Sequence, residues 1–218
     1  MIYNNIAETL WSMTCQPASF DRLGAVFVDN VNGWLPSSGI RLSVVLDWML
    51  NQVACEPSFR YVCARLCNVM CSRCRVNEGT RTFRDLLLSR CQSLYRQAGA
   101  LLAESERSFA ELTVLFCELY LHVRLAGGEE PIAVLGSAVL GLCGQLLDAV
   151  TPGGARTVCQ ALKLTGAALE RQERPPSGGL SAEERWFMEQ QVQTAEEDED
   201  DELDEAYEAF LDELEQHN

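Results

Sequence analysis

The sequence predicts an all-α protein made of helical hairpins that stack on one another. Apolar residues recur at the three-and-four spacing of a helix face along most of the chain. Proline and glycine interrupt this pattern at short intervals, and no segment shows the sustained alternation of a strand. Short links favour antiparallel helix pairs, and such pairs can stack only by burying the apolar face of each on the next.

The interruptions divide the chain into eight expected helices, or four hairpins. The breaks contain Pro, Gly or Asn and fall at residues 16–17, 36–39, 56–57, 77–80, around 99, 127–128 and 152–154. The helices are expected near residues 3–14, 18–33, 39–54, 57–75, 81–98, 103–126, 130–150 and 154–172.

The clearest pattern lies in residues 59–95, which predict one helical hairpin around a turn at residues 77–80. The residues at helical spacing are Phe59, Val62, Cys63, Leu66, Val69 and Met70, then Phe83, Leu86, Leu87, Arg90, Cys91 and Leu94. We expect Leu66, Cys67 and Leu87, with Leu119 further along the chain, to be buried in the core.

The other side of this hairpin is basic. It holds eight of the seventeen basic residues: Arg60, Arg65, Arg73, Arg75, Arg81, Arg84, Arg90 and Arg96. Their guanidinium groups can form a binding face for an RNA backbone or for an acidic protein. The alternative is a solvated helix face with local pairs to Glu78 and Asp85. A sequence-specific RNA reader is not expected, since no exposed aromatic residues are interleaved with the arginines.

The net charge of −15 is concentrated at the C-terminus. Residues 196–215 hold thirteen of the thirty-two acidic residues, which leaves nineteen acids against seventeen bases, a net of −2. Residues 174–179 (RPPSGG) form an expected linker, and Ser181 and Glu184 have capping-box spacing ahead of Trp186. We therefore expect a helical domain at 1–173, a linker that can hold a short helix at 174–195, and a disordered acidic tail at 196–218.

The acidic tail also carries an apolar stripe. Seven consecutive acids at 196–202 are followed by Leu203, Tyr207, Phe210, Leu211 and Leu214 on one helical side, among Glu205, Glu208, Asp212 and Glu215. A peptide this short is only marginally helical in water, so the stripe is expected to order against a partner. The simpler alternative is a solvated tail that only keeps the protein soluble.

The ten cysteines favour reduced thiols in a cytoplasmic protein, because they occupy apolar helical positions and the N-terminus lacks a secretory signal pattern. The spacing of Cys63, Cys67, Cys71 and Cys74 is zinc-like, but the first and last would lie roughly 16 Å apart on one helix. A single zinc ion needs all four sulfurs at about 2.3 Å, so buried packing is favoured, with a two-cysteine half-site as the alternative. No metal and no other cofactor are expected.

Neither a membrane span nor a catalytic site is predicted. Residues 131–147 contain no charge but are short for a bilayer, which favours a core helix packed closely through Gly136, Gly141 and Gly144. His122 follows Cys117 by five residues, but periodicity does not pair them. No phosphate loop, nucleophile elbow or zincin motif occurs, so we predict no catalytic residues and a protein that is not an enzyme.

Several short runs resemble the poly(A)-binding protein-interacting protein 1 family, whose core is a middle domain of initiation factor 4G. In order, they are residues 64–68 (ARLCN), Phe83-Arg84 followed by 86–88 (LLL) and Arg90-Cys91, residues 115–121 (LFCELYL), residues 162–166 (LKLTG) with Leu169-Glu170 and, in the tail, 204–210 (DEAYEAF). The resemblance of the helical part extends over residues 20–170. It implies a HEAT-like α–α superhelix, and it departs from the family in that a fifth hairpin is missing or reduced to residues 180–193.

The resemblance implies a non-catalytic, cytoplasmic adaptor that regulates translation initiation. Its partners would be the RNA-recognition motifs of poly(A)-binding protein and the initiation machinery, through helicase factor 4A or factor 3. The tail residues implied in binding are Glu205, Tyr207, Glu208, Phe210, Leu211 and Leu214. The short N-terminal motif of longer members is not expected, because the helical pattern begins almost at Met1. The alternative function is an RNA-binding or cap-associated scaffold that uses the Arg-rich hairpin.

Overall fold

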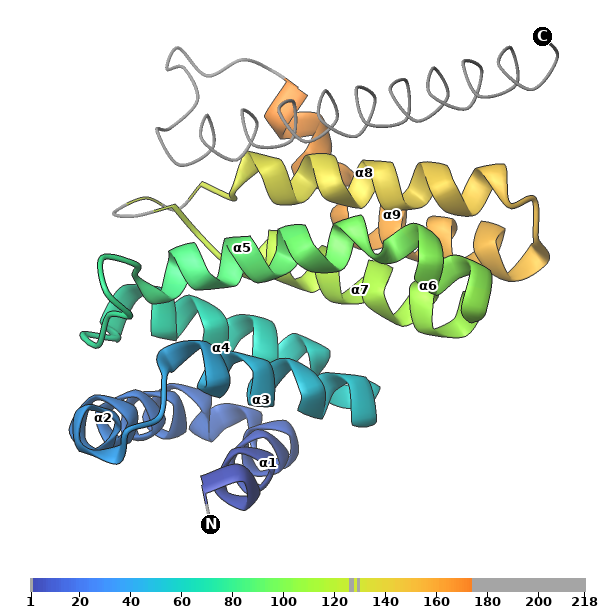
Figure 1. Ribbon diagram of the computed structural model, residues 1–218. Helices are drawn as coiled ribbons and strands as arrows, with labels where there is room; N and C mark the ends of the chain where they lie inside the picture. Colours follow the sequence, from blue (N-terminus) through green and yellow to red (C-terminus); the bar gives the residue numbers. More distant parts are fainter. Residues whose placement is uncertain (1, 126–127, 129, 174–218) are drawn as a thin grey trace, which may run out of the picture. The chain divides into compact units, whose positions relative to one another are not determined.

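The computed structural model describes residues 2–125, 128 and 130–173, which are helical almost throughout (Figure 1). Its elements are α1 (Ile2–Cys15), η1 (Pro17–Ser19), α2 (Phe20–Ser38), α3 (Leu42–Cys55), η2 (Pro57–Phe59), α4 (Arg60–Arg73), α5 (Phe83–Arg96), α6 (Ala98–Glu104), α7 (Glu106–His122), α8 (Ala133–Asp148) and α9 (Pro152–Glu173). Within these residues β-structure is limited to two isolated bridges, Glu78 with Arg81 and Arg124 with Pro131. The predicted all-α class is confirmed.

The helices form stacked pairs (Figure 1). α1 packs against α2, α3 against α4 and α8 against α9, while α6 links α5 to α7 and packs against both. Successive pairs also pack on each other: α1, α3 and α5 follow one another in one layer, and α2, α4, α7 and α9 in the other. Each pair therefore buries its apolar side on the next, as a superhelix of hairpins requires.

The core contains the residues that the periodicity assigned to it. Leu66, Cys67, Leu87 and Leu119 are each 0% exposed, so their predicted burial is confirmed. The predicted central hairpin also forms, as α4 and α5 on either side of a turn in which Gly79 has a φ of 66°. Glycine reaches this left-handed conformation without the steric cost of a side chain.

α2 is longer than the sequence predicts. The expected helix ended at residue 33, whereas α2 continues through Pro36 and ends at Ser38, before Gly39 at a φ of 71°. Proline is tolerated here because only the last turn loses a helical hydrogen bond. The hydroxyls of Ser37 and Ser38 donate to the carbonyls of Trp34 and Leu35, at 3.1 and 2.8 Å, and so satisfy acceptors that a helix end leaves open.

The break expected around Gly99 forms at Gln97, between α5 and α6, and a second break that was not expected lies at Ser105. Gly99 sits inside the short helix α6, which the sequence did not predict as a separate element. Ser105 is extended, with φ and ψ of −155° and 101°, and its hydroxyl accepts the Ser108 N–H at 3.2 Å. This N-cap starts α7 at Glu106, three residues later than expected, because capping fixes the boundary more strongly than one glycine breaks a helix.

α8 forms most of the uncharged segment at 131–147, and two of its three glycines make the predicted close contacts. A Cβ at Gly136 would lie 2.9 Å from the Tyr120 ring, and one at Gly141 would collide with the Tyr95 hydroxyl. Gly144 differs from the prediction, since a Cβ there would meet no heavy atom within 4 Å. Of the described helices, none has the length and apolarity needed to cross a membrane.

Candidate functional site

The sequence predicts two binding surfaces, the basic hairpin and the acidic tail, and the described residues include only the hairpin. The implied tail residues, Glu205, Tyr207, Glu208, Phe210, Leu211 and Leu214, lie outside the described residues. The chain divides after Arg174, and the helical unit before it contains all eight arginines of the basic hairpin. Those arginines do not form one continuous face.

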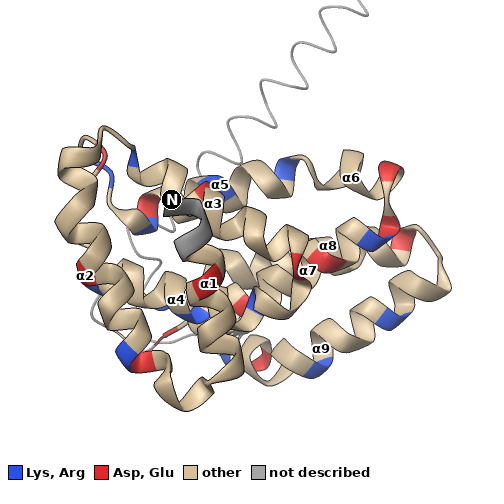
Figure 2. Ribbon diagram, turned by 90° about the horizontal axis from the view of Figure 1, so that it is seen from below, with Lys and Arg blue, Asp and Glu red and all other residues tan. Residues whose placement is uncertain are grey.

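Three of them are held against acidic side chains of other helices. Arg60 on α4 pairs with Glu111 of α7, and Arg90 on α5 pairs with Asp47 of α3, with 3.0 Å between Nε and Oδ1. Arg65 lies 3.9 Å above the Phe20 ring and 3.5 Å from the nearest carboxylate oxygen of Asp21. Charged groups of both signs are accordingly interspersed over these helices (Figure 2).

Arg84 is not on the surface at all. The sequence predicted that Arg84 lies on an accessible basic face, and this is wrong. Its side chain is 9% exposed and lies in the core beside Cys71. Burial raises the pKa of the Cys71 thiol to about 12, although the neighbouring Arg84 guanidinium acts in the opposite direction. Helical spacing carried a signal for this, because Arg84 lies three, four and seven residues before Leu87, Leu88 and Cys91, which are all buried.

The accessible arginines gather at the loop between α4 and α5. We call Arg41, Arg73, Arg75 and Arg81 the basic tip; all four are exposed. Two contacts order this loop: the Asn32 side chain donates to the Arg73 carbonyl at 3.1 Å and accepts the Arg75 N–H at 2.8 Å. Arg96 ends α5, roughly 20 Å along the helix from its start, and is not part of the basic tip.

Glu78 is the acid placed within the basic tip. Its carboxylate accepts the Ser43 N–H at 2.9 Å and lies 3.6 Å from Arg41. The hydrogen bond from Ser43 holds the pKa of the Glu78 carboxyl below its usual value, with Arg41 and Arg81 acting in the same direction. Glu78 therefore stays charged and neutralises part of the tip, which limits how strongly the tip can attract a polyanion.

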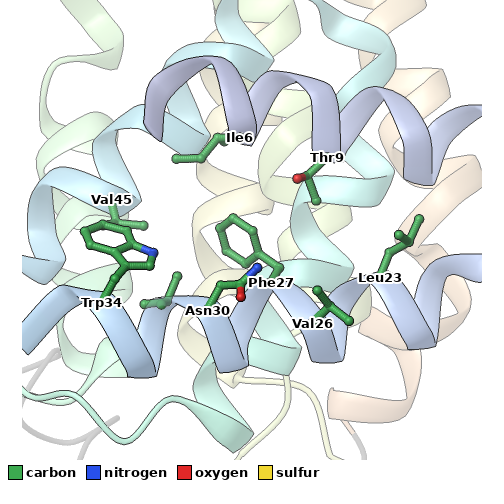
Figure 3. A pocket seen from close by; sticks show the side chains of 9 residues that line it. Ile6, Thr9, Leu23, Val26, Phe27, Asn30, Trp34 and Val45 are labelled. Atoms are coloured by element: carbon green, nitrogen blue, oxygen red, sulfur yellow. The ribbon is translucent and has the colours of Figure 1, made fainter. Parts of the chain in front are cut away.

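An apolar groove between α1 and α2 is a feature that the sequence reading missed. Its volume is about 360 Å³, and Figure 3 shows Ile6 and Thr9 of α1 facing Phe27 of α2 across it. The lining residues are Ile6, Thr9, Leu23, Val26, Phe27, Asn30, Val31, Trp34 and Val45. None is charged, so the groove can take an apolar group of moderate size. The sequence did carry a sign of this groove, because α2 has apolar residues on more than one of its sides.

Cys117 and His122, which were considered as a catalytic pair, are kept apart by the fold. Cys117 is buried in the core, and burial raises its pKa to about 12. His122 instead faces the surface, where its Nε2 is 3.4 Å from a Glu118 oxygen and its ring meets the Tyr61 ring edge-on at 4.9 Å. The described residues also contain no cluster of three or more His, Cys, Asp or Glu side chains placed to hold a metal ion.

The fold and these surfaces can be set beside known proteins. No family model matches the sequence. The chain is similar to Polyadenylate-binding protein-interacting protein 1 of Xenopus laevis, with 28% identity over 171 residues. The relationship is a distant one. The match covers 76% of this chain but only 37% of the relative, so the chain spans little more than a third of that protein's length.

Proposed function

We propose that this protein is a non-catalytic adaptor that regulates translation initiation by binding poly(A)-binding protein. The observation that carries the proposal is the similarity of most of the chain to a protein named for that interaction. The helical hairpins would provide a second surface for the initiation machinery, through helicase factor 4A or factor 3. Stacked hairpins suit such a role because they expose long surfaces for other proteins.

The contact with poly(A)-binding protein is assigned to residues 196–215. Seven consecutive acids would speed the encounter with a basic RNA-recognition motif, since long-range attraction acts mainly on association. The stripe that includes Tyr207 and Phe210 would supply short-range energy as it orders against the partner. The two parts of the tail therefore have separable kinetic roles.

The test is a surface-plasmon measurement of peptide 194–218 against tandem RNA-recognition motifs at two salt concentrations. Replacing the acids of 196–202 by their amides should slow association and flatten its dependence on salt. Replacing Tyr207 and Phe210 together by alanine should speed dissociation, each anchor contributing about 1–3 kcal/mol. Gln216→Ala, outside the stripe, is the matched control.

Two results would count against this assignment. An unchanged dissociation rate for the double-alanine peptide would reduce the tail to a nonspecific polyanion. Absence of binding by the unmodified peptide would move the contact to the helical domain.

The second candidate function is binding of RNA through the basic tip. It is favoured by the exposure of Arg73, Arg75 and Arg81 at one loop. Fluorescence anisotropy of the full chain with a single-stranded oligonucleotide would show weaker binding for Arg73→Gln with Arg75→Gln, and a salt slope reduced by about one for each lost phosphate contact. Arg107→Gln on α7 is the control, and equal losses in both variants would rule out a site at the tip.

A further inference from the structure

The outer side of the last hairpin carries an apolar strip that no described residue covers. Leu140 and Leu147 on α8 are 47% and 56% exposed, and Leu162 on α9 is 46% exposed. Leu140 and Leu147 are seven residues apart and so share one side of α8. Grouped exposed leucines of this kind usually mark a surface that another molecule covers.

Close approaches between α8 and α9 fix how the strip is assembled. Gly136 lies against Leu169, and Gly154 lies against Leu146, so the two helices run antiparallel in a defined register. These two contacts place Leu140 level with residues 160–165 of α9, on the N-terminal side of Gly166. The angular positions of Leu162 and Gly166 around the α9 axis put both residues on the side that borders α8, next to the α8 leucines.

Two glycines of the strip have open space above them. A Cβ at Gly144 or at Gly166 would meet no heavy atom within 4 Å. Glycine inside a helix costs roughly 0.5–1 kcal/mol relative to alanine, and no described contact accounts for its use at either position. Both glycines would let a second helix backbone approach the strip closely.

The charges beside the strip are symmetric about Gly166. Lys163 and Glu170 lie on the exposed side of α9, about 10 Å apart along the helix axis. Neither forms an ion pair with another described residue. A two-fold axis that passes between Gly166 and Ala167 would place each of the two charges opposite the other one in a second copy.

We propose that this strip is a homodimer interface in which two copies pack face to face about that axis. α9 then runs antiparallel to α9 of the second copy, and Leu140 lies level with Leu162 of its own copy. The strip itself is uncharged, and its flanking charges complement themselves, which favours a second copy over a charged partner. Apolar burial supplies the affinity, and the two Lys163–Glu170 pairs fix the register.

The first test is sedimentation velocity of the full chain across micromolar concentrations. The unmodified protein should dimerise. Leu140→Glu or Leu162→Glu should make it monomeric, because dimerisation would then bury the charged carboxylate of the new glutamate in the strip. Leu164→Glu is the matched control. Leu164 is 39% exposed but lies two residues after Leu162, on the opposite side of α9, so this variant should remain dimeric.

The second test examines the register. Lys163→Glu and Glu170→Lys should each raise the dimer Kd by about tenfold, because each creates two like-charge contacts. Combining them should restore the original Kd. The proposal is overturned if the unmodified protein is monomeric, or if Leu164→Glu dissociates the dimer as strongly as Leu140→Glu does. A double variant whose dimer Kd stays raised would overturn the antiparallel register. The tail is unchanged in all these variants, so its binding to poly(A)-binding protein is tested separately.

Discussion

Arg84 and Arg73 belong to the same basic hairpin, yet the first lies in the core and the second in solvent. Their side chains are identical, so the difference comes from the side of the helix that each occupies and from what covers that side. The cysteines differ in the same way. Cys91 and Cys117 are buried, whereas Cys159 is exposed.

The buried thiols should make stability fall at alkaline pH. Burial raises the pKa of Cys71, Cys91 and Cys117 to about 12, whereas a thiol in the unfolded chain titrates near 8.5. Their contribution to stability is therefore complete below about pH 8.5 and is lost progressively as the pH rises toward 12. Urea unfolding at a series of pH values measures this. Cys91→Ala should flatten the dependence, and a free energy of unfolding that does not change above pH 8.5 would contradict the argument.

Leu87 provides the corresponding test of the core. The side chain is 0% exposed, so Leu87→Ala should lower the free energy of unfolding by about 2–5 kcal/mol through lost burial and a residual cavity. Leu164→Ala removes the same atoms from a 39% exposed position and should cost less than about 1 kcal/mol. Chemical denaturation of both variants measures the difference, and equal losses would place Leu87 outside the core.

At the scale of elements, glycine has opposite roles in α8 and α2. Gly136 brings α8 close to α7 and α9, since a Cβ there would lie 2.9 Å from Tyr120 and 3.1 Å from Leu169. Gly33 in α2 is exposed, and a Cβ there would meet nothing within 4 Å. The same residue type is therefore a packing requirement in one helix and a cost in the other.

Alanine substitution should separate these two roles. Gly136→Ala should destabilise the protein by about 1–3 kcal/mol, because overpacking outweighs the gain in helix propensity. Gly33→Ala should stabilise it by about 0.5–1 kcal/mol, because only the propensity changes. Thermal unfolding of the two variants gives the comparison, and a shift of the same sign in both would contradict the assigned packing.

At the scale of the whole molecule, the proposed function divides the work between the helical domain and the acidic tail. The helices up to α9 bury their core residues among themselves. Removing the tail should therefore leave the circular dichroism of the helical domain in place. It should also remove the surface assigned to poly(A)-binding protein.

A pull-down with the full chain and with a chain that ends at Gln193 tests this division. The full chain should retain poly(A)-binding protein, and the shortened chain should lose it while keeping any initiation factor bound by the helices. Retention of poly(A)-binding protein by the shortened chain would assign that contact to the helical domain instead.

The sequence by itself determined the local features of this protein. Helix class follows from three-and-four spacing, most helix boundaries follow from Pro, Gly and Asn, and the charge of residues 196–215 follows from counting. The burial of Leu66, Cys67, Leu87 and Leu119 was also predictable, because each lies in the middle of an apolar helical face. All of these depend on residues close together in the chain.

Only the tertiary structure decided which side of each helix is covered. Arg90 meets Asp47 across more than forty residues of sequence, and the α1–α2 groove needs Val45 of α3 to complete its lining. The same holds for Gly144, where a Cβ would lie in open space. Periodicity shows that residues share a side of a helix, but the helix that covers this side is chosen by packing between segments far apart in the chain.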